Sequence, residues 1–297
     1  VLAEMAGSGL TATELGPEGF LPSDTAELVD TLDRFGLRCV GGFVPVVLFD
    51  ESHDPADDLA GPLDSLVAAG AGVVVLAAAT GADGYDARPE LSERQWETLL
   101  TNLDRLTEVV AERGLKAVLH PHVGTMVENR AEVDRVLAGS RIPLCLDTGH
   151  LLIGGTDPLQ LARQVPERVQ HCHLKDVDAA LAARVQAGEL TYTEAVAAGM
   201  YVPLGQGDVD IAGIVTALEF ELFDLPTVYG GGIFFAGSAA VGVAGIDATP
   251  ASTGDVVPMA SITKLVTALM VLDAQRLRRP VEISTEPTHA EIVDPYT

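Results

Sequence analysis

LCLDTGH at residues 144–150 and VQHCHLKD at residues 169–176 are apolar runs that each end in charged and histidine side chains. Continuous apolar runs of this length are typical of strands that are covered on both faces. Four similar runs precede them along the chain: TATEL at 11–15, LRCVGGF at 37–43, VVVLAA at 73–78 and KAVLHPH at 116–122. The sequence therefore predicts six strands between residues 11 and 176.

Helical patterns separate these strands. Ser92 with Gln95, and Asn129 with Glu132, have the spacing of a capping box, which marks the first turn of a helix. Another amphipathic pattern covers residues 23–35. Strands that alternate with helices predict parallel strands with right-handed crossovers, in a barrel or in an open doubly wound sheet. No G-x-G-x-x-G follows a predicted strand, which argues against the dinucleotide-binding version.

The overall charge narrows the choice of partners. The 297-residue chain has a formal net charge of −25, so phosphate backbones and anionic lipids should repel it. We expect no nucleic-acid or membrane partner, and no run is long enough for a transmembrane helix. The first residues lack the pattern of a secretory signal. Cys39, Cys145 and Cys172 lie in apolar stretches and are expected to be buried, reduced thiols, which favours a cytoplasmic location.

Polar side chains concentrate where the predicted strands end. The residues are His120, His122, Asp147, His150, His173, Lys175 and Asp176. In a barrel of parallel strands, the carboxyl-terminal rim is the place that gathers side chains from several strands, and active sites are built there. The rim is therefore the predicted functional site.

Five of the seven histidines fall on three consecutive strand ends. A single histidine of this kind is usually a hydrogen-bonded structural residue, but the clustering favours a metal site. Asp147 and His150 would come from one strand end, and His171 and His173 share a strand face because they are two residues apart. Mixed nitrogen and oxygen donors suit a divalent cation without distinguishing Mn²⁺, Co²⁺, Mg²⁺ and Zn²⁺.

Several motifs resemble one known family. HPHVGTMVEN at 120–129, LCLDTGHLLIGG at 144–155, HCHLKDV at 171–177 and PLGQGDVD at 203–210 are similar to the xylose isomerase-like superfamily of sugar isomerases and epimerases. The inosose dehydratases are the nearest group, and the resemblance covers about residues 1–218. It implies a (β/α)8-type TIM barrel of the α/β class. It also implies a metal-dependent isomerase, epimerase or dehydratase that abstracts a proton next to a carbonyl of a small sugar or inosose.

The resemblance also implies residue roles. Asp147 and His173 would be metal ligands, and His120 stands where many relatives carry a glutamate ligand. His150 and Lys175 are the candidates for moving protons. The remaining rim residues, Glu14, His122, His171 and Asp176, are expected to contact the substrate. Glu128 has a weaker claim, because a helix-capping or surface role suits it equally well.

Two parts of the family pattern have no counterpart in this sequence. The family has a strand before the position of Val1, and an eighth strand whose glutamate completes the metal site; FELFDLPTVYGGG at 220–232 occupies the latter place. Six strands cannot close an eight-stranded barrel. The barrel is then open, or a neighbouring chain in a homo-oligomer fills the gap, or strands near 227–228 and 233–235 do. We expect an incomplete barrel domain at 1–222 and an unrelated extension at 223–297.

The extension resembles a different family. SAAVGVAG at 238–245 and VPMASITKLVTALMVLDA at 257–274 are similar to the opening of a D-alanyl-D-alanine carboxypeptidase, with Ser261 and Lys264 as its S-x-x-K pair. The later motifs of that family do not follow, so we expect residues 259–274 to form a packing helix without acyl-transfer activity. The alternatives to a sugar enzyme are a catalytically inactive barrel remnant or binding protein and, remotely, a carboxypeptidase fragment.

Overall fold

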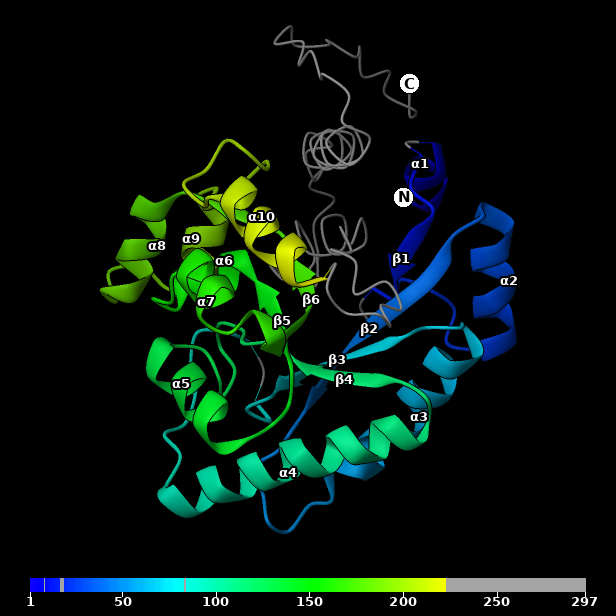
Figure 1. Ribbon diagram of the computed structural model, residues 1–297, viewed down its shortest axis with the longest axis horizontal. Helices are drawn as coiled ribbons and strands as arrows, with labels where there is room; N and C mark the ends of the chain where they lie inside the picture. Colours follow the sequence, from blue (N-terminus) through cyan, green and yellow to red (C-terminus); the bar gives the residue numbers. More distant parts are fainter. Residues whose placement is uncertain (8, 17–18, 83, 223–297) are drawn as a thin grey trace, which may run out of the picture.

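The computed structural model describes residues 1–7, 9–16, 19–82 and 84–222 (Figure 1). Six parallel strands form one sheet in sequential order, which curls into part of a barrel. They are β1 (Ala12–Glu14), β2 (Arg38–Val46), β3 (Val73–Ala78), β4 (Lys116–Leu119), β5 (Leu144–Asp147) and β6 (Val169–His173). The expected parallel, barrel-like sheet is confirmed, and β1 and β6 are its edges within the described residues.

Helices alternate with the strands, and α2, α3 and α4 pack along the outer side of the sheet (Figure 1). The helices are α1 (Leu2–Gly7), α2 (Thr25–Phe35), α3 (Pro55–Ala68), α4 (Glu93–Glu112), α5 (Arg130–Gly139), α6 (Thr148–Ile153), α7 (Pro158–Gln164), α8 (Ala179–Gln186), α9 (Tyr192–Ala197) and α10 (Ile211–Leu222), with a 3₁₀ turn η1 (Pro166–Arg168). A short antiparallel pair, β7 (Asp176–Val177) and β8 (Tyr201–Val202), follows the sheet.

The predicted helix starts are confirmed. The Ser92 hydroxyl caps α4 and the Asn129 side chain caps α5, and in both helices the side chain at the third position bonds back to the cap residue. The pattern at 23–35 is α2, which ends at Gly36 with φ 65°, a left-handed conformation that glycine adopts without strain.

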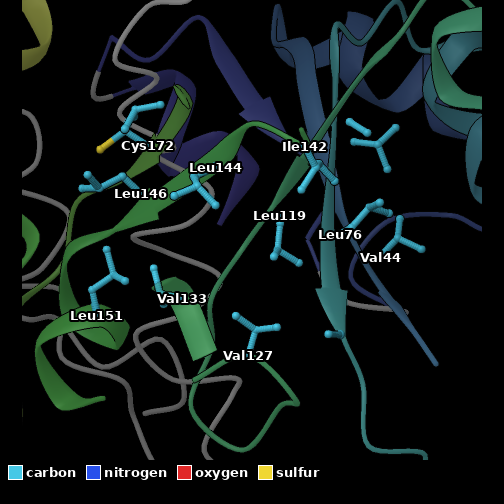
Figure 2. Packing of buried hydrophobic residues seen from close by; sticks show 14 of the residues in the cluster. Val44, Leu76, Leu119, Val127, Val133, Ile142, Leu144, Leu146, Leu151 and Cys172 are labelled. Carbon is cyan, nitrogen blue, oxygen red and sulfur yellow. The ribbon is translucent and has the colours of Figure 1, made fainter. Parts of the chain in front are cut away.

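The core has two layers because successive strand residues point to opposite faces. The outer layer, between sheet and helices, includes Leu76, Leu119 and Leu146 (Figure 2). The inner layer lies inside the curl and consists of Val73, Val75, Val118 and Cys145. All six residues of β3 are buried, as expected for a strand covered on both faces. The three cysteines are buried and free, also as expected.

The last three strands end earlier than the sequence pattern suggested. Pro121 follows β4 and has no backbone N–H to continue a strand ladder. Asp147 ends β5 because its side chain caps α6, accepting a hydrogen bond from the backbone N of His150 at 2.8 Å. His150 therefore lies on a helix and not on the strand.

Other expectations concern residues outside the described ranges. They are the domain boundary after 222, the strands near 227–228 and 233–235, the helix at 259–274, and Ser261 with Lys264. None of the helices in the described part of the chain combines the length and apolar character needed to cross a membrane.

Candidate metal centre

Side chains from β1, β4, β5 and β6 meet at the carboxyl-terminal rim of the sheet. Glu14 is the last residue of β1, His120 follows β4 directly, and Asp147 is the last residue of β5. His171 and His173 face the inside of the curl from β6, in register with Cys145 and Asp147. All of these side chains are buried. The strand order, which places β4, β5 and β6 side by side, explains why their polar ends converge.

Asp147 is the centre of one group of side chains. Its Oδ2 lies 3.1 Å from Nε2 of His120, 3.7 Å from Nδ1 of His173 and 3.3 Å from Nζ of Lys175. Burial alone would raise the pKa of this carboxyl, but the ammonium of Lys175 and the neighbouring histidines together outweigh burial and hold the pKa well below its usual range. Asp147 is therefore a carboxylate at neutral pH, with one oxygen turned towards two imidazole rings.

Glu14 is the centre of a second group, across the curl from the first. Its Oε1 lies 2.5 Å from Nε2 of His171 and 2.9 Å from Nε2 of His173. Burial opposes charge on both partners, yet the pKa of His173 is raised well above its usual value and that of Glu14 is lowered. Burial also raises the pKa of the adjacent Cys145 thiol, which stays neutral, so the carboxylates supply the negative charge beside His173.

His150 lies beside the Asp147 group. The ammonium of Lys175 donates to Nε2 of His150 at 2.9 Å, and the ring of His122 is tilted against that of His150 with centroids 3.6 Å apart. Burial, the adjacent ring of His122 and the ammonium of Lys175 lower the pKa of His150 well below 6.5, so its imidazole is neutral at neutral pH. Burial also lowers the pKa of His120 to about 3. Neutral imidazoles are the form that binds metals and accepts protons.

Several nitrogen and oxygen atoms at this rim, which could bind a metal, lack hydrogen-bond partners in the described part of the structure. They are Nδ1 and Nε2 of His120, Oδ2 of Asp147, and Nδ1 of His150 and of His173. An unsatisfied buried polar atom costs on the order of 1–3 kcal/mol, so several in one place indicate a bound group. His120, Asp147 and His150 offer three ligand atoms within 4.8 Å of one another, as do Glu14, His171 and His173. The donor set therefore fits a divalent cation.

The structure gives Asp176 a setting that does not suit substrate binding. Its Oδ1 accepts the backbone N–H groups of Val177 and Val209, and its Oδ2 accepts those of Gly205 and Gly207, at 2.8–3.1 Å. Four amide donors use the hydrogen-bonding capacity of a carboxylate. Asp176 thus holds the 203–209 loop in place. The expectation that it contacts the substrate does not suit this setting, because backbone amides occupy both of its oxygens.

The D-T-G-H motif positions Lys175 as well as Asp147. The Thr148 hydroxyl donates to the backbone O of Lys175 at 2.5 Å and accepts from its backbone N at 2.7 Å. A Cβ on Gly149 would lie 2.8 Å from Cβ of Lys175 and 3.0 Å from the Tyr201 ring, closer than side-chain atoms normally pack. Threonine and glycine at these positions therefore allow the two chain segments to approach closely.

Several aromatic side chains lie beside the histidines, and the sequence did not predict them. The Tyr85 ring lies 5.2 Å from that of His122, and the hydroxyls of Tyr192 and Tyr201 are 3.0 Å apart. Phe43 on β2 lies 5.7 Å from the His120 ring and is 39% exposed in a strand that is otherwise mostly buried. These rings come from segments far apart in the chain, so no local pattern could have grouped them.

Glu128 has a structural role. Its Oε2 accepts the backbone N–H of Gly124 at 2.7 Å and lies 3.3 Å from Nε of Arg88. Arg88 also pairs with Glu132, the third residue of α5, whose side chain bonds back to the cap residue Asn129. This network fixes the loop between His122 and α5, and so holds the second half of H-P-H in place.

Comparisons with known proteins agree with this geometry. The family model for the xylose isomerase-like TIM barrel matches residues 2–229. The chain belongs to this family. Inosose dehydratase from Geobacillus thermodenitrificans (strain NG80-2) is 30% identical over 229 residues, which cover 73% of this chain and 76% of the relative. The rhizopine catabolism protein MocC of Rhizobium meliloti is 32% identical over 226 residues, covering 73% and 69%.

A solved structure of the IOLI protein with a bound zinc atom has the same fold. It superposes with a TM-score of 0.55 at 16% identity, covering 73% of this chain and 78% of that chain. The superfamily and the nearest group that the motifs predicted are both confirmed.

Proposed function

We propose that the chain is a divalent-metal-dependent sugar or inositol isomerase, epimerase or dehydratase, of the inosose dehydratase type, with its active site at the rim of the open barrel. The observation that carries the proposal is the convergence of Asp147 with three buried histidines, each of which has an atom that lacks a hydrogen-bond partner in the described residues; the histidines are His120, His150 and His173. Inosose dehydratases among the relatives and the zinc atom of the IOLI protein support the same class of chemistry. The three buried free thiols favour a cytoplasmic enzyme.

The ligands that we assign to the metal are His120, Asp147 and His173. Asp147 Oδ2 is turned towards ring nitrogens of both histidines, at 3.1 and 3.7 Å. When bound, a divalent cation polarises a substrate carbonyl and its neighbouring hydroxyl, which acidifies the C–H bond beside the carbonyl. Zn²⁺, Mn²⁺, Co²⁺ and Mg²⁺ all remain compatible with this donor set.

The proton is moved, in this proposal, by His150 and Lys175. His150 is neutral, buried and adjacent to the metal ligands, so it can accept a proton from carbon. Lys175 donates to the same imidazole and carries a proton that can be returned to carbon or to a departing hydroxide. Return to carbon completes an isomerisation or epimerisation, and transfer to hydroxide completes a dehydration.

Substrate hydroxyls would meet the remaining polar groups of the rim. His122 stacks against His150, at the side of the proposed proton-moving groups. The rings of Tyr85, Tyr192 and Tyr201 give the site an apolar wall of the kind that packs against the C–H face of a sugar ring. Small polyhydroxylated ketones fit both features.

The test measures loss of the proton on the carbon beside the carbonyl, a step that isomerisation, epimerisation and dehydration share. Purified protein is loaded separately with Zn²⁺, Mn²⁺ or Co²⁺ and incubated in D₂O with inososes and ketohexoses, while NMR follows exchange at the carbon beside the carbonyl. We expect exchange with at least one compound, abolished by Asp147→Asn and lowered at least ~10²-fold by His150→Gln, because general-base groups contribute about 10²–10⁴. His150→Gln should keep its metal.

The matched control is His53→Gln, which removes a surface histidine paired with Asp58. It should leave both metal content and exchange unchanged. Metal binding without exchange on any compound would contradict an enzyme and favour an inactive binding protein.

A further inference from the structure

A carboxylate oxygen faces each of the two ring nitrogens of His173. Its Nδ1 faces Asp147 Oδ2 at 3.7 Å, and its Nε2 faces Glu14 Oε1 at 2.9 Å. An imidazole nitrogen has one lone pair in the ring plane, and the two nitrogens point in diverging directions. One ion cannot use both edges. The cation proposed above, at the Nδ1 edge, therefore leaves a complete donor set at the Nε2 edge.

We propose that Glu14, His171 and His173 form a second divalent-cation site, which joins the two edge strands of the open sheet. The inference rests on the proposed function only in taking the first ion to lie at the Nδ1 edge. Two imidazoles and one carboxylate are a known donor set for zinc and for other first-row divalent metals. All three side chains are buried, and their ligand atoms lie within 4.8 Å of one another.

The spacing of the three donors suits an ion after a small adjustment. Ligand atoms about 2.0–2.1 Å from a tetrahedral ion are roughly 3.3 Å from one another. The Glu14 oxygen lies 2.5 and 2.9 Å from the two imidazole nitrogens, so each has to move apart by less than ~1 Å. An ion at this place would displace to solvent the protons that His171 and His173 share with Glu14. His173 would then offer one ring nitrogen to each of the two sites.

The role of this site follows from the topology. Among the described strands, β1 pairs only with β2 and β6 only with β5, so no ladder of backbone hydrogen bonds joins the two edges. β1 has three residues and an irregular register at Glu14, so its attachment to the sheet is short. Glu14 is separated from His171 by 157 residues in sequence. A cation held by both would crosslink the ends of the sheet and fix the His173 ring.

The experiment counts ions in the full-length chain. The protein is stripped with a chelator and titrated with Zn²⁺, and bound metal per chain is measured by elemental analysis after gel filtration. We expect about two ions in the wild type, and about one each in Glu14→Gln, His171→Gln and Asp147→Asn, because each variant removes one ligand set. His53→Gln, the surface control, should keep both ions.

A second readout is the thermal unfolding midpoint. In the wild type it should rise with the first and again with the second equivalent of Zn²⁺, since a ligand bound only by the folded state stabilises it. Glu14→Gln should lack one of these two steps. Far-UV circular dichroism checks the fold of each variant, and His171→Gln tests the same site independently of Glu14.

Two results would overturn the proposal. One ion in the wild type, retained by Glu14→Gln and lost from Asp147→Asn, removes the second site and leaves the proposed function standing. No ion in the wild type at saturating Zn²⁺ overturns both proposals.

Discussion

Asp176→Asn should be among the most destabilising single substitutions that preserve side-chain size in this chain. The carboxylate accepts four backbone N–H groups, from Val177, Gly205, Gly207 and Val209, and is 1% exposed. Asparagine retains one acceptor oxygen and turns an NH₂ group towards two of these amides. Two bonds to a charged group are lost at about 1.5–3 kcal/mol each, so we expect a loss of about 3–6 kcal/mol.

Thermal and urea unfolding, each on the metal-free protein, measure this loss. For a domain of this size, 1 kcal/mol corresponds to roughly 2–4 °C, so the midpoint should fall by about 6–24 °C. The matched control is Asp178→Asn. Asp178 caps α8 by accepting from the backbone N of Ala180 and Leu181, and asparagine caps a helix about as well. Equal stability of the two variants would refute the structural role of Asp176, and loss of metal without loss of stability would return it to the functional site.

Three further predictions concern the site and the layer beneath it. Metal-free protein should lose about 1.4 kcal/mol per pH unit for each of His120 and His150 below pH ~6.5, because the unfolded chain protonates both imidazoles while the folded chain, in which burial lowers both pKa values, does not; urea unfolding at pH 7.0 and 5.5 checks this, and equal stability at both would contradict buried neutral imidazoles. Gly149→Ala should displace Lys175 and lower substrate C–H exchange at least ~10-fold while the metal content stays unchanged; normal exchange would contradict the close approach. Val75→Ala should cost about 1–3 kcal/mol without changing the metal count, because Val75 is fully buried in the inner layer; a loss of bound metal would show that this layer also orients the ligands.

The strands and their order were predictable because each strand is a local apolar run. The same holds for helix starts, since Ser92 and Asn129 act on backbone groups within one turn. Strand ends were less predictable. Asp147 could have continued a strand, and only the hydrogen bond to the His150 backbone shows that it begins a helix.

The sequence predicted which polar side chains gather at the site, but not which other residues each of them contacts. His120, Asp147 and His173 follow strands that are neighbours in the sheet, so strand order alone brings them together. The contact of Glu14 with β6 depends on how far the sheet curls, which no local pattern encodes. The role of Asp176 could not be read from the motif either, because its four donors come mainly from a loop about 30 residues further on.

The open sheet does not prevent the site from assembling, and the reason lies in which strands supply it. His120, Asp147 and His173 come from β4, β5 and β6, which pair directly with one another. Below them, Val73, Val75, Val118 and Cys145 fill the inside of the curl, so the donors rest on a packed layer and not on water. A closed barrel would place further strands between β6 and β1. In this chain Glu14 reaches directly from β1 to β6, so one side chain connects the two edges of the described sheet. The placement of His173 then depends on Glu14 as well as on its own strand, and a change at Glu14 should disturb the position of a proposed metal ligand that it does not adjoin in sequence.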